Sequence, residues 1–242
     1  MNKRKYLVGI DPSFATMGAS IYNPETKKII EMFTGDFNEV VGWIGRMVKL
    51  SEVYAIVENP ALDKAVFKMW GLMLKEVHAF ARGQMWKVGR IKVQGHQANA
   101  SEVQSQFAIC MNYAQKVGEN KAAAKLIIKM LAERGVPVIE VAPSERERAF
   151  KKDKKGKIIR KDVRLLKMPT KTSQEQFKTL TGWEKRSSEH ARDSATLLWG
   201  KNLTWCRNMA AIELAKAKGK PSSYPSKANY NEFVIDKNSV SL

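Results

Sequence analysis

The chain has 242 residues, 44% of them hydrophobic, which is enough for one globular domain with a substantial core. It carries 42 Lys and Arg against 24 Asp and Glu, and a formal charge of +18 indicates a polyanionic partner, nucleic acid before an acidic membrane surface. The apolar runs are too short for a signal sequence or a membrane span, and the two cysteines lack zinc-site spacing, so we expect a cytoplasmic, nucleic-acid-associated protein without a secretion signal or a membrane partner.

Residues 6–22 predict a strand, a turn and a second strand, because short apolar runs flank Asp11 and Pro12. Asp11 would then lie at the mouth of a buried strand, where an unpaired carboxylate costs several kcal/mol. A metal ion is one partner that would remove this cost. The alternative is that Asp11 forms a local side-chain turn before Pro12.

A third strand is expected over residues 28–33, an amphipathic helix over 37–50, and a short apolar strand over 54–57 that leads into Glu58. A strand that follows a crossover helix lies parallel to its partner in the sheet. If residues 54–57 pair with the first strand, Asp11 and Glu58 emerge at one sheet edge. Neighbouring strands are about 4.8 Å apart, so the two carboxylates could share a cation.

The middle of the chain predicts alternating helices and strands. Residues 61–82 carry an apolar stripe typical of a core helix, and 83–97 form a hairpin or a loop that contacts the ligand. A long helix follows over 102–134, interrupted near Gly118, and then a strand over 136–141. This order predicts a mixed α/β fold.

Residues 144–171 change the composition, with twelve Lys and Arg against four Asp and Glu and no sustained apolar period. We interpret the segment as a mobile basic arm that contacts phosphates, although a charge run can also be a merely solvated surface. Five lysines at its centre are candidates for DNA binding: Lys151, Lys152, Lys154, Lys155 and Lys157.

A short helix is expected over residues 173–180, and the serines before Glu189 are good N-caps for another helix. His190 and Asp193 are three residues apart, so a helix places both on one face, where they could chelate one ion. The alternative is a solvent-facing pair at a helix N-terminus.

We divide the chain into a domain over residues 1–218, with the basic insertion at about 144–171, and a tail over 219–242. The tail is rich in Ser, Pro, Asn and Lys, so we expect it to be irregular or disordered. The domain contains all the candidate ligands, which are Asp11, Glu58, His190 and Asp193. Such hard ligands suit magnesium or manganese, and two of these ions can bracket a phosphodiester.

Four segments of the chain resemble RuvC-like Holliday-junction resolvases of the ribonuclease H-like superfamily. GIDPSFATMGASIY is similar to their first-strand motif, and AIVENP to their second acidic strand. GENKAAAKLIIKMLAERGVPVIEVAP looks like their following helix and strand, and SQEQFKTLTG with EHARDSATL like their final segment.

This resemblance implies a ribonuclease H-like mixed five-stranded sheet flanked by helices. It also implies that Asp11, Glu58, His190 and Asp193 bind two magnesium ions, which manganese could replace. The family acts as a homodimer that nicks opposing strands of a four-way junction, and Lys171 and Ser173 fall where it contacts phosphate.

The chain departs from the family after Glu58, where Asn59, Pro60, Ala61 and Leu62 replace an expected aromatic residue. A ribonuclease H-like nuclease acting on RNA/DNA hybrids or forks is therefore an alternative. Two other classes remain: an ATPase of the actin and sugar-kinase type, and a non-catalytic DNA-binding protein. Against the ATPase, the sequence shows no second Gly-rich phosphate loop, so we expect no nucleotide cofactor.

Overall fold

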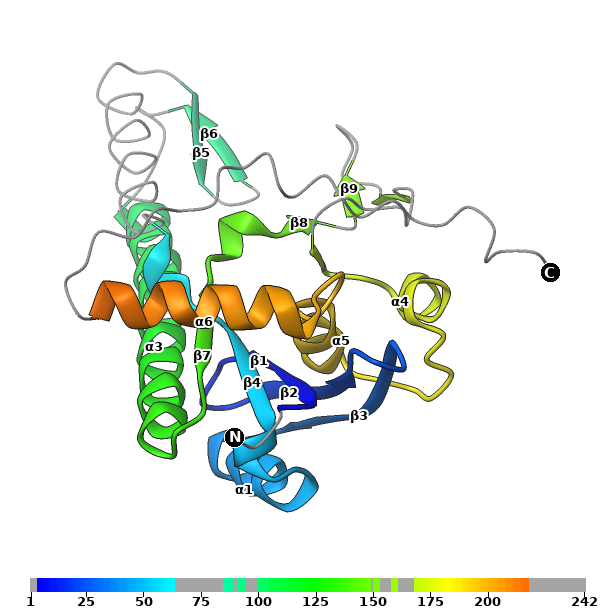
Figure 1. Ribbon diagram of the computed structural model, residues 1–242. Coiled ribbons are helices and arrows are strands. Elements are labelled where there is room, and N and C mark those ends of the chain that lie inside the picture. Colours follow the sequence, from blue (N-terminus) through cyan, green and yellow to red (C-terminus); the bar gives the residue numbers. More distant parts are fainter. Residues whose placement is uncertain are drawn as a thin grey trace.

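The computed structural model has at its centre a five-stranded mixed sheet with strand order β3-β2-β1-β4-β7 (Figure 1). Strands β1, β2 and β3 form an antiparallel meander, whereas β4 pairs parallel with β1, and β7 pairs parallel with β4. The predicted α/β fold with a ribonuclease H-like sheet is confirmed by this order and these directions. The strands are β1 (Tyr6–Asp11), β2 (Met17–Asn23), β3 (Lys28–Gly35), β4 (Val53–Glu58) and β7 (Val138–Val141). The structure describes residues 4–63, 85–88, 91–94, 100–148, 150–152, 158–160 and 168–217.

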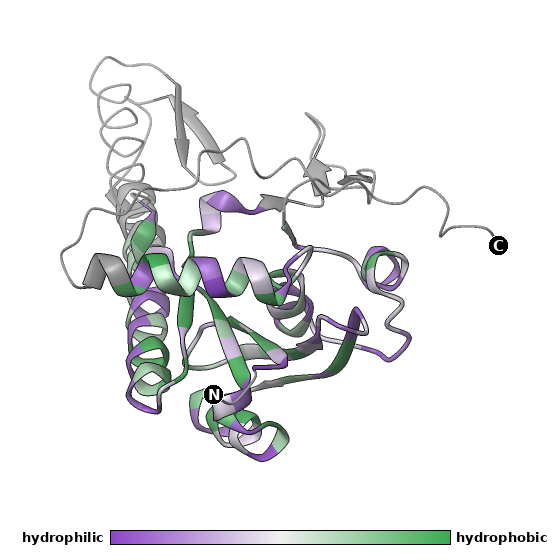
Figure 2. Ribbon diagram, viewed as in Figure 1, coloured by the Kyte–Doolittle hydropathy of each residue, from purple (hydrophilic) through white to green (hydrophobic). Residues whose placement is uncertain are grey.

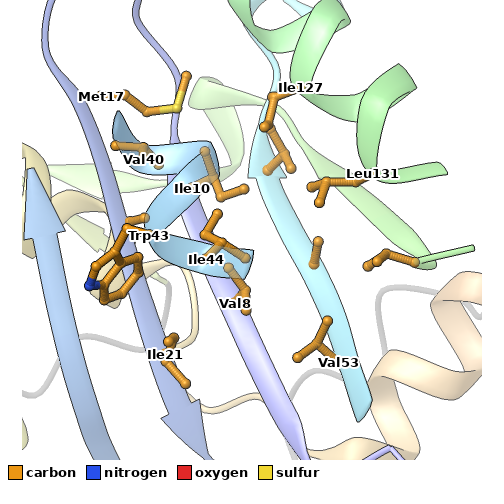
Figure 3. Close-up of a cluster of buried hydrophobic side chains, with 14 residues drawn as sticks. Val8, Ile10, Met17, Ile21, Val40, Trp43, Ile44, Val53, Ile127 and Leu131 are labelled. Atoms are coloured by element: carbon orange, nitrogen blue, oxygen red, sulfur yellow. The ribbon is translucent and has the colours of Figure 1, made fainter. Parts of the chain in front are cut away.

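Helices cover both faces of the sheet. Helices α1 (Phe37–Met47) and α3 (Ala100–Glu133) pack on one face, through a cluster that includes Val8, Trp43 and Ile127 (Figure 3). Helices α5 (Glu189–Thr196) and α6 (Leu203–Ala217) cover the other face. Burying one large apolar side chain contributes about 1.5–3 kcal/mol, so these two clusters supply much of the stability of the sheet. Figure 2 shows hydrophobic residues along the central strands and hydrophilic residues interspersed along α3.

Helix α1 begins where its sequence predicts, because Asp36 and Glu39 form a reciprocal capping box. The Glu39 amide donates to Oδ1 of Asp36 at 2.9 Å, and the Asp36 amide donates to Oε2 of Glu39 at 2.8 Å. Helix α4 (Gln174–Thr181) begins in the same way at Ser173 and ends at Gly182, which adopts a left-handed conformation.

The helices differ from the sequence prediction in two respects. Helix α3 runs through Gly118 without a break, since a glycine costs a helix only about 1 kcal/mol and 34 residues of helix outweigh it. Helix α6 was not predicted at all. Residues 83–97 were expected to form a hairpin or a loop. The structure shows a hairpin there, in which β5 (Met85–Val88) pairs antiparallel with β6 (Ile91–Gln94). A helix was expected over residues 61–82. The structure describes only residues 61–63 of this range, where a 3-10 turn over Pro60–Leu62 ends, and the rest lies outside the described residues.

The basic segment is not wholly irregular where the structure describes it. Strand β8 (Glu147–Arg148) pairs parallel with β11 (Pro169–Thr170), and β9 (Phe150–Lys152) pairs antiparallel with β10 (Ile158–Arg160). Lys151 and Lys152 lie in β9. The tail over 219–242 and the candidates Lys154, Lys155 and Lys157 lie outside the described residues. Over the described ranges, no helix has both the length and the apolar character needed to cross a membrane.

Candidate active site

Asp11 and Glu58 lie at the same edge of the sheet, as the strand pairing predicted. Their strands, β1 and β4, are parallel, and Ile10 is paired with Val57, so each acid is the next residue after a paired one. Both side chains are largely shielded from solvent. The two carboxylates are near enough that the charge of Asp11 helps to raise the pKa of Glu58.

Helix α5 reaches this edge because two strand glycines leave room for its main chain. A Cβ atom at Gly9 would lie 2.1 Å from the carbonyl oxygen of Ser194, and one at Gly18 would lie 2.0 Å from that of His190. Any side chain at either position would push the helix away. The helix backbone therefore packs directly on β1 and β2, and this brings His190 and Asp193 to the end of β1.

His190 contacts Asp11 directly. Its Nδ1 atom lies 3.0 Å from Oδ2 of Asp11. This hydrogen bond raises the pKa of His190 above its ordinary value, and it outweighs burial, which favours the neutral ring. The predicted ligands Asp11 and His190 are thus brought together, although the sequence suggested His190 and Asp193 as the pair that would share an ion.

Asp193 is buried and interacts with Lys171 twice. Its Oδ1 atom accepts from the Lys171 amide at 2.8 Å, and its Oδ2 atom lies 3.0 Å from Nζ of Lys171. The same ammonium group also pairs with Glu189. Burial lowers the pKa of Lys171, but its hydrogen bonds with Glu189 and Asp193 outweigh this and raise the pKa to about 12. Lys171 therefore stays charged beside the carboxylates, with a left-handed backbone at φ 57°.

Arg146 is a residue of the site that the sequence did not single out. Its Nη1 atom pairs with Glu58, while Nη2 donates to the carbonyl oxygens of Pro169 and Asp193 at 2.9 and 2.8 Å. Nη2 also donates to Oγ1 of Thr196 at 2.7 Å, and the Arg146 side chain is only 1% exposed. A buried guanidinium group thus joins the end of β4 to helix α5 and strand β11.

Glu58 experiences opposing influences. Burial is the largest, and it raises the pKa of the carboxyl group, whereas the charge and hydrogen bond of Arg146 lower it. The neighbouring carboxylates of Asp11 and Asp193 raise it further, and the pKa lies above the ordinary value as a result. The position of Arg146 could have been suspected from topology, since Arg146 follows β7, the neighbour of β4, by only a few residues.

The donor types at this edge fit a magnesium ion, because three carboxylates and an imidazole are hard or borderline ligands. Each carboxylate, however, has a basic partner in the chain itself: Asp11 has His190, Glu58 has Arg146, and Asp193 has Lys171. Within the described part of the chain, no three His, Cys, Asp or Glu side chains are grouped closely enough to hold a metal. For an ion to bind at this edge, these basic side chains would therefore have to move away from the carboxylates.

Ser173, a candidate phosphate contact, is engaged in starting helix α4. Its hydroxyl oxygen accepts from the Gln176 amide at 3.1 Å.

Another basic surface lies on α3, beyond the end of β4. There a groove of about 570 Å³ has three lysines one helical turn apart along its wall, with Asn59 and Glu140 at the sheet. The lining lysines are Lys121, Lys125 and Lys129.

The strand order and directions give this chain the ribonuclease H-like architecture, and Asp11, Glu58 and Asp193 lie at what we call the carboxylate edge of its sheet. No protein-family model and no curated protein matches the sequence. Among solved structures, the chain is similar to RuvC of T. thermophilus in complex with a Holliday junction substrate, with 11% identity and a TM-score of 0.38. The alignment covers 88% of this chain and 96% of that one. A likeness of this size adds nothing to what the strand order already establishes.

Proposed function

We propose that the protein is a metal-dependent endonuclease that resolves four-way DNA junctions by paired, symmetric nicks. The observation that supports this proposal is the convergence of Asp11, Glu58, His190 and Asp193 on one edge of the sheet from three separate elements. An acidic site within a chain of charge +18 fits a nuclease, because the basic surface attracts the phosphates and the acids bind the ions that offset phosphate charge.

The four residues would hold magnesium, two ions in this proposal, with manganese as a substitute. Bound there, the ions would supply the positive charge that activates a water molecule and stabilises the leaving oxygen. Asp11, at the centre of the edge, would orient His190 through their hydrogen bond. In the alternative to binding an ion, His190 in its neutral form would accept the proton of the attacking water.

Lys171 and the lysines of α3 would act on the DNA. The Lys171 ammonium group lies against Asp193, so it is suited to contact the phosphate that is cut. Attack in line would break the bond to the 3′ oxygen, which leaves a 5′ phosphate and a 3′ hydroxyl. Two symmetric nicks in one junction require two active sites, and we therefore propose a homodimer.

The test is cleavage of a labelled four-way junction beside linear duplex, a fork and an RNA/DNA hybrid, in magnesium and in EDTA. Wild type should cut only the junction, at paired sites and only with magnesium. Asp11→Asn should lose at least about 100-fold in rate, because it removes a predicted ligand, but keep DNA binding. Glu184→Gln, at an exposed ion pair with Lys178, is the control and should cut normally.

Other outcomes assign the protein differently. Cleavage of the hybrid or the fork in place of the junction would keep the metal site and change the substrate. Absence of cleavage on all four substrates would contradict the nuclease proposal. It would leave a non-catalytic DNA-binding protein or an ATPase as the alternatives, which nucleotide binding would separate.

A further inference from the structure

The guanidinium group of Arg146 contacts two of the predicted metal ligands. It pairs with Glu58 through Nη1 and lies 3.9 Å from Oδ1 of Asp193 through Nη2, so it stands between two of the predicted ligands. An arginine cannot lose its proton inside a protein, and so the positive charge is permanent. With 1% exposure of its side chain, the charge is also poorly screened by water.

The hydrogen bonds of this group are unevenly distributed. Nη2 has three acceptors, in Pro169, Asp193 and Thr196, which fix one corner of the guanidinium plane. The Nε atom is buried and has no acceptor among the described residues. A buried donor without a partner is unfavourable, so the arrangement around Glu58 is not the best that the guanidinium could have.

We propose that Arg146 competes with a divalent ion for Glu58. In the ion-free protein the guanidinium neutralises Glu58 and stabilises the carboxylate edge; an ion can use Glu58 only by displacing that contact or by binding against its charge. Arg146 thereby lowers the affinity of the site for metal and makes the ion that depends on Glu58 the weaker one. This inference rests on the metal site of the proposed function, but not on the choice of nucleic acid.

The sign of the effect separates competition from a merely structural role. Replacing Arg146 by an apolar residue removes a positive charge and leaves Glu58 without a partner, so competition predicts tighter metal binding. If Arg146 only holds β4 and α5 together, its loss disorders the ligands, and metal binding weakens or stays the same.

The experiment is calorimetric titration of manganese into the DNA-free, full-length protein. Arg146→Met should bind manganese at least about tenfold more tightly than wild type, as expected for removal of one like charge at short range. Arg146→Lys, which keeps the charge, should stay closer to wild type. The double variant Arg146→Met with Glu58→Gln should lose the gain, since the gain acts through Glu58.

Arg4→Met is the matched control, because Arg4 donates to the carbonyl oxygen of Val53, at the opposite end of the same strand from Glu58. It should leave manganese affinity unchanged. If Arg146→Met does not fold, as judged by circular dichroism, Arg146→Gln keeps an amide donor for Glu58 without the charge and should show the same gain.

Folded Arg146→Met or Arg146→Gln protein that binds manganese no more tightly than wild type would overturn the inference. Absence of manganese binding in every variant would overturn both the inference and the proposed metal site. Tighter binding in a protein that cuts none of the four nucleic acids would support the inference and contradict the nuclease proposal.

Discussion

Nδ1 of His190 and Oδ2 of Asp11 are 3.0 Å apart, although the two residues are 179 positions apart in the chain. The hydrogen bond holds the pKa of His190 above its ordinary value of about 6.5 in the metal-free protein. A raised pKa in the folded state means that the pair stabilises the fold fully below about pH 6.5. That stability is lost as the pH rises through the pKa of the folded protein.

The first prediction is that Asp11→Asn lowers the pKa of His190. The amide cannot offer the negative charge that favours the imidazolium ion. Burial and the charge of Lys171 then lower the pKa of the ring, and only the charge of Glu189 opposes them. NMR titration of the histidine ring protons without metal measures this, and the chain has only three histidines to resolve. An unchanged pKa in the variant would contradict the proposed coupling.

The same pair predicts the acid limb of nuclease activity. A protonated imidazole can neither bind a metal nor accept a proton, so the rate should fall as the pH drops through the pKa of His190, which Asp11 holds above its ordinary value. Single-turnover rates at saturating magnesium, measured between pH 5 and 8, test this expectation. A flat profile across that range would exclude a role for neutral His190.

Gly18→Ala should distort the site from a position that carries no functional group. The added methyl group would lie 2.0 Å from the carbonyl oxygen of His190. This oxygen belongs to the backbone, so it cannot move aside as the end of a flexible side chain can. We expect a loss of about 1–3 kcal/mol in unfolding free energy, measured by urea denaturation, together with slower cleavage. Gly45→Ala in α1, where nothing lies within 4 Å, is the control and should stabilise the protein slightly. Equal stabilities of the two variants would be inconsistent with close backbone packing at Gly18.

Lys171 offers a way to separate backbone strain from charge. Its φ of 57° suits glycine, so Lys171→Gly should be more stable than Lys171→Ala by about 1 kcal/mol. Both variants lack the ammonium group beside Asp193 and should cut about 10–100-fold more slowly than wild type. Thermal unfolding and cleavage rates measure the two effects independently. Equal stability of the glycine and alanine variants would argue against strain at this residue.

Lys201 should make stability depend on alkaline pH. The residue is 9% exposed and its Nζ atom lies 4.2 Å from the Trp205 ring centroid. Burial lowers the pKa of Lys201 to about 8. The folded state disfavours the charged form of Lys201, and this lowers the free energy of unfolding. The loss of stability is complete below pH 8 and disappears as the pH rises towards 10.5.

Lys201→Met should therefore be more stable than wild type at pH 7, by up to about 3 kcal/mol, less the lost cation–π contact. The difference should shrink at pH 9.5. Burial raises the pKa of the nearby Cys206 thiol to about 12, and this effect largely cancels when the two proteins are compared at one pH. A difference that does not change with pH would rule out a buried charge at Lys201.

The parts of the fold that the sequence predicts are those with a regular apolar period. The apolar run before Asp11 and the one before Glu58 each mark a strand end, and the parallel pairing follows from the crossover helix. The spacing of His190 and Asp193 likewise predicts one helix face. Each of these inferences uses only local pattern and a topological rule.

The residues that the sequence does not reveal depend on contacts between distant segments. Arg146 is one of twelve basic residues in the segment 144–171, and only the position of β7 beside β4 distinguishes it from the others. Gly9 and Gly18 look like weak points in strands until α5 is placed against them. The continuity of α3 through Gly118 was missed because the local penalty of a glycine says nothing of the length of helix on either side.

The direct contact between α5 and strands β1 and β2 has a consequence for how the protein can vary. The spacing between the two halves of the carboxylate edge is set by main-chain atoms that touch, and not by the size of any side chain between them. Substitutions in the two apolar clusters can therefore raise or lower stability while the distance from Asp11 to His190 stays the same. Adaptation to a new substrate would have to act through the loops and basic surfaces around the edge.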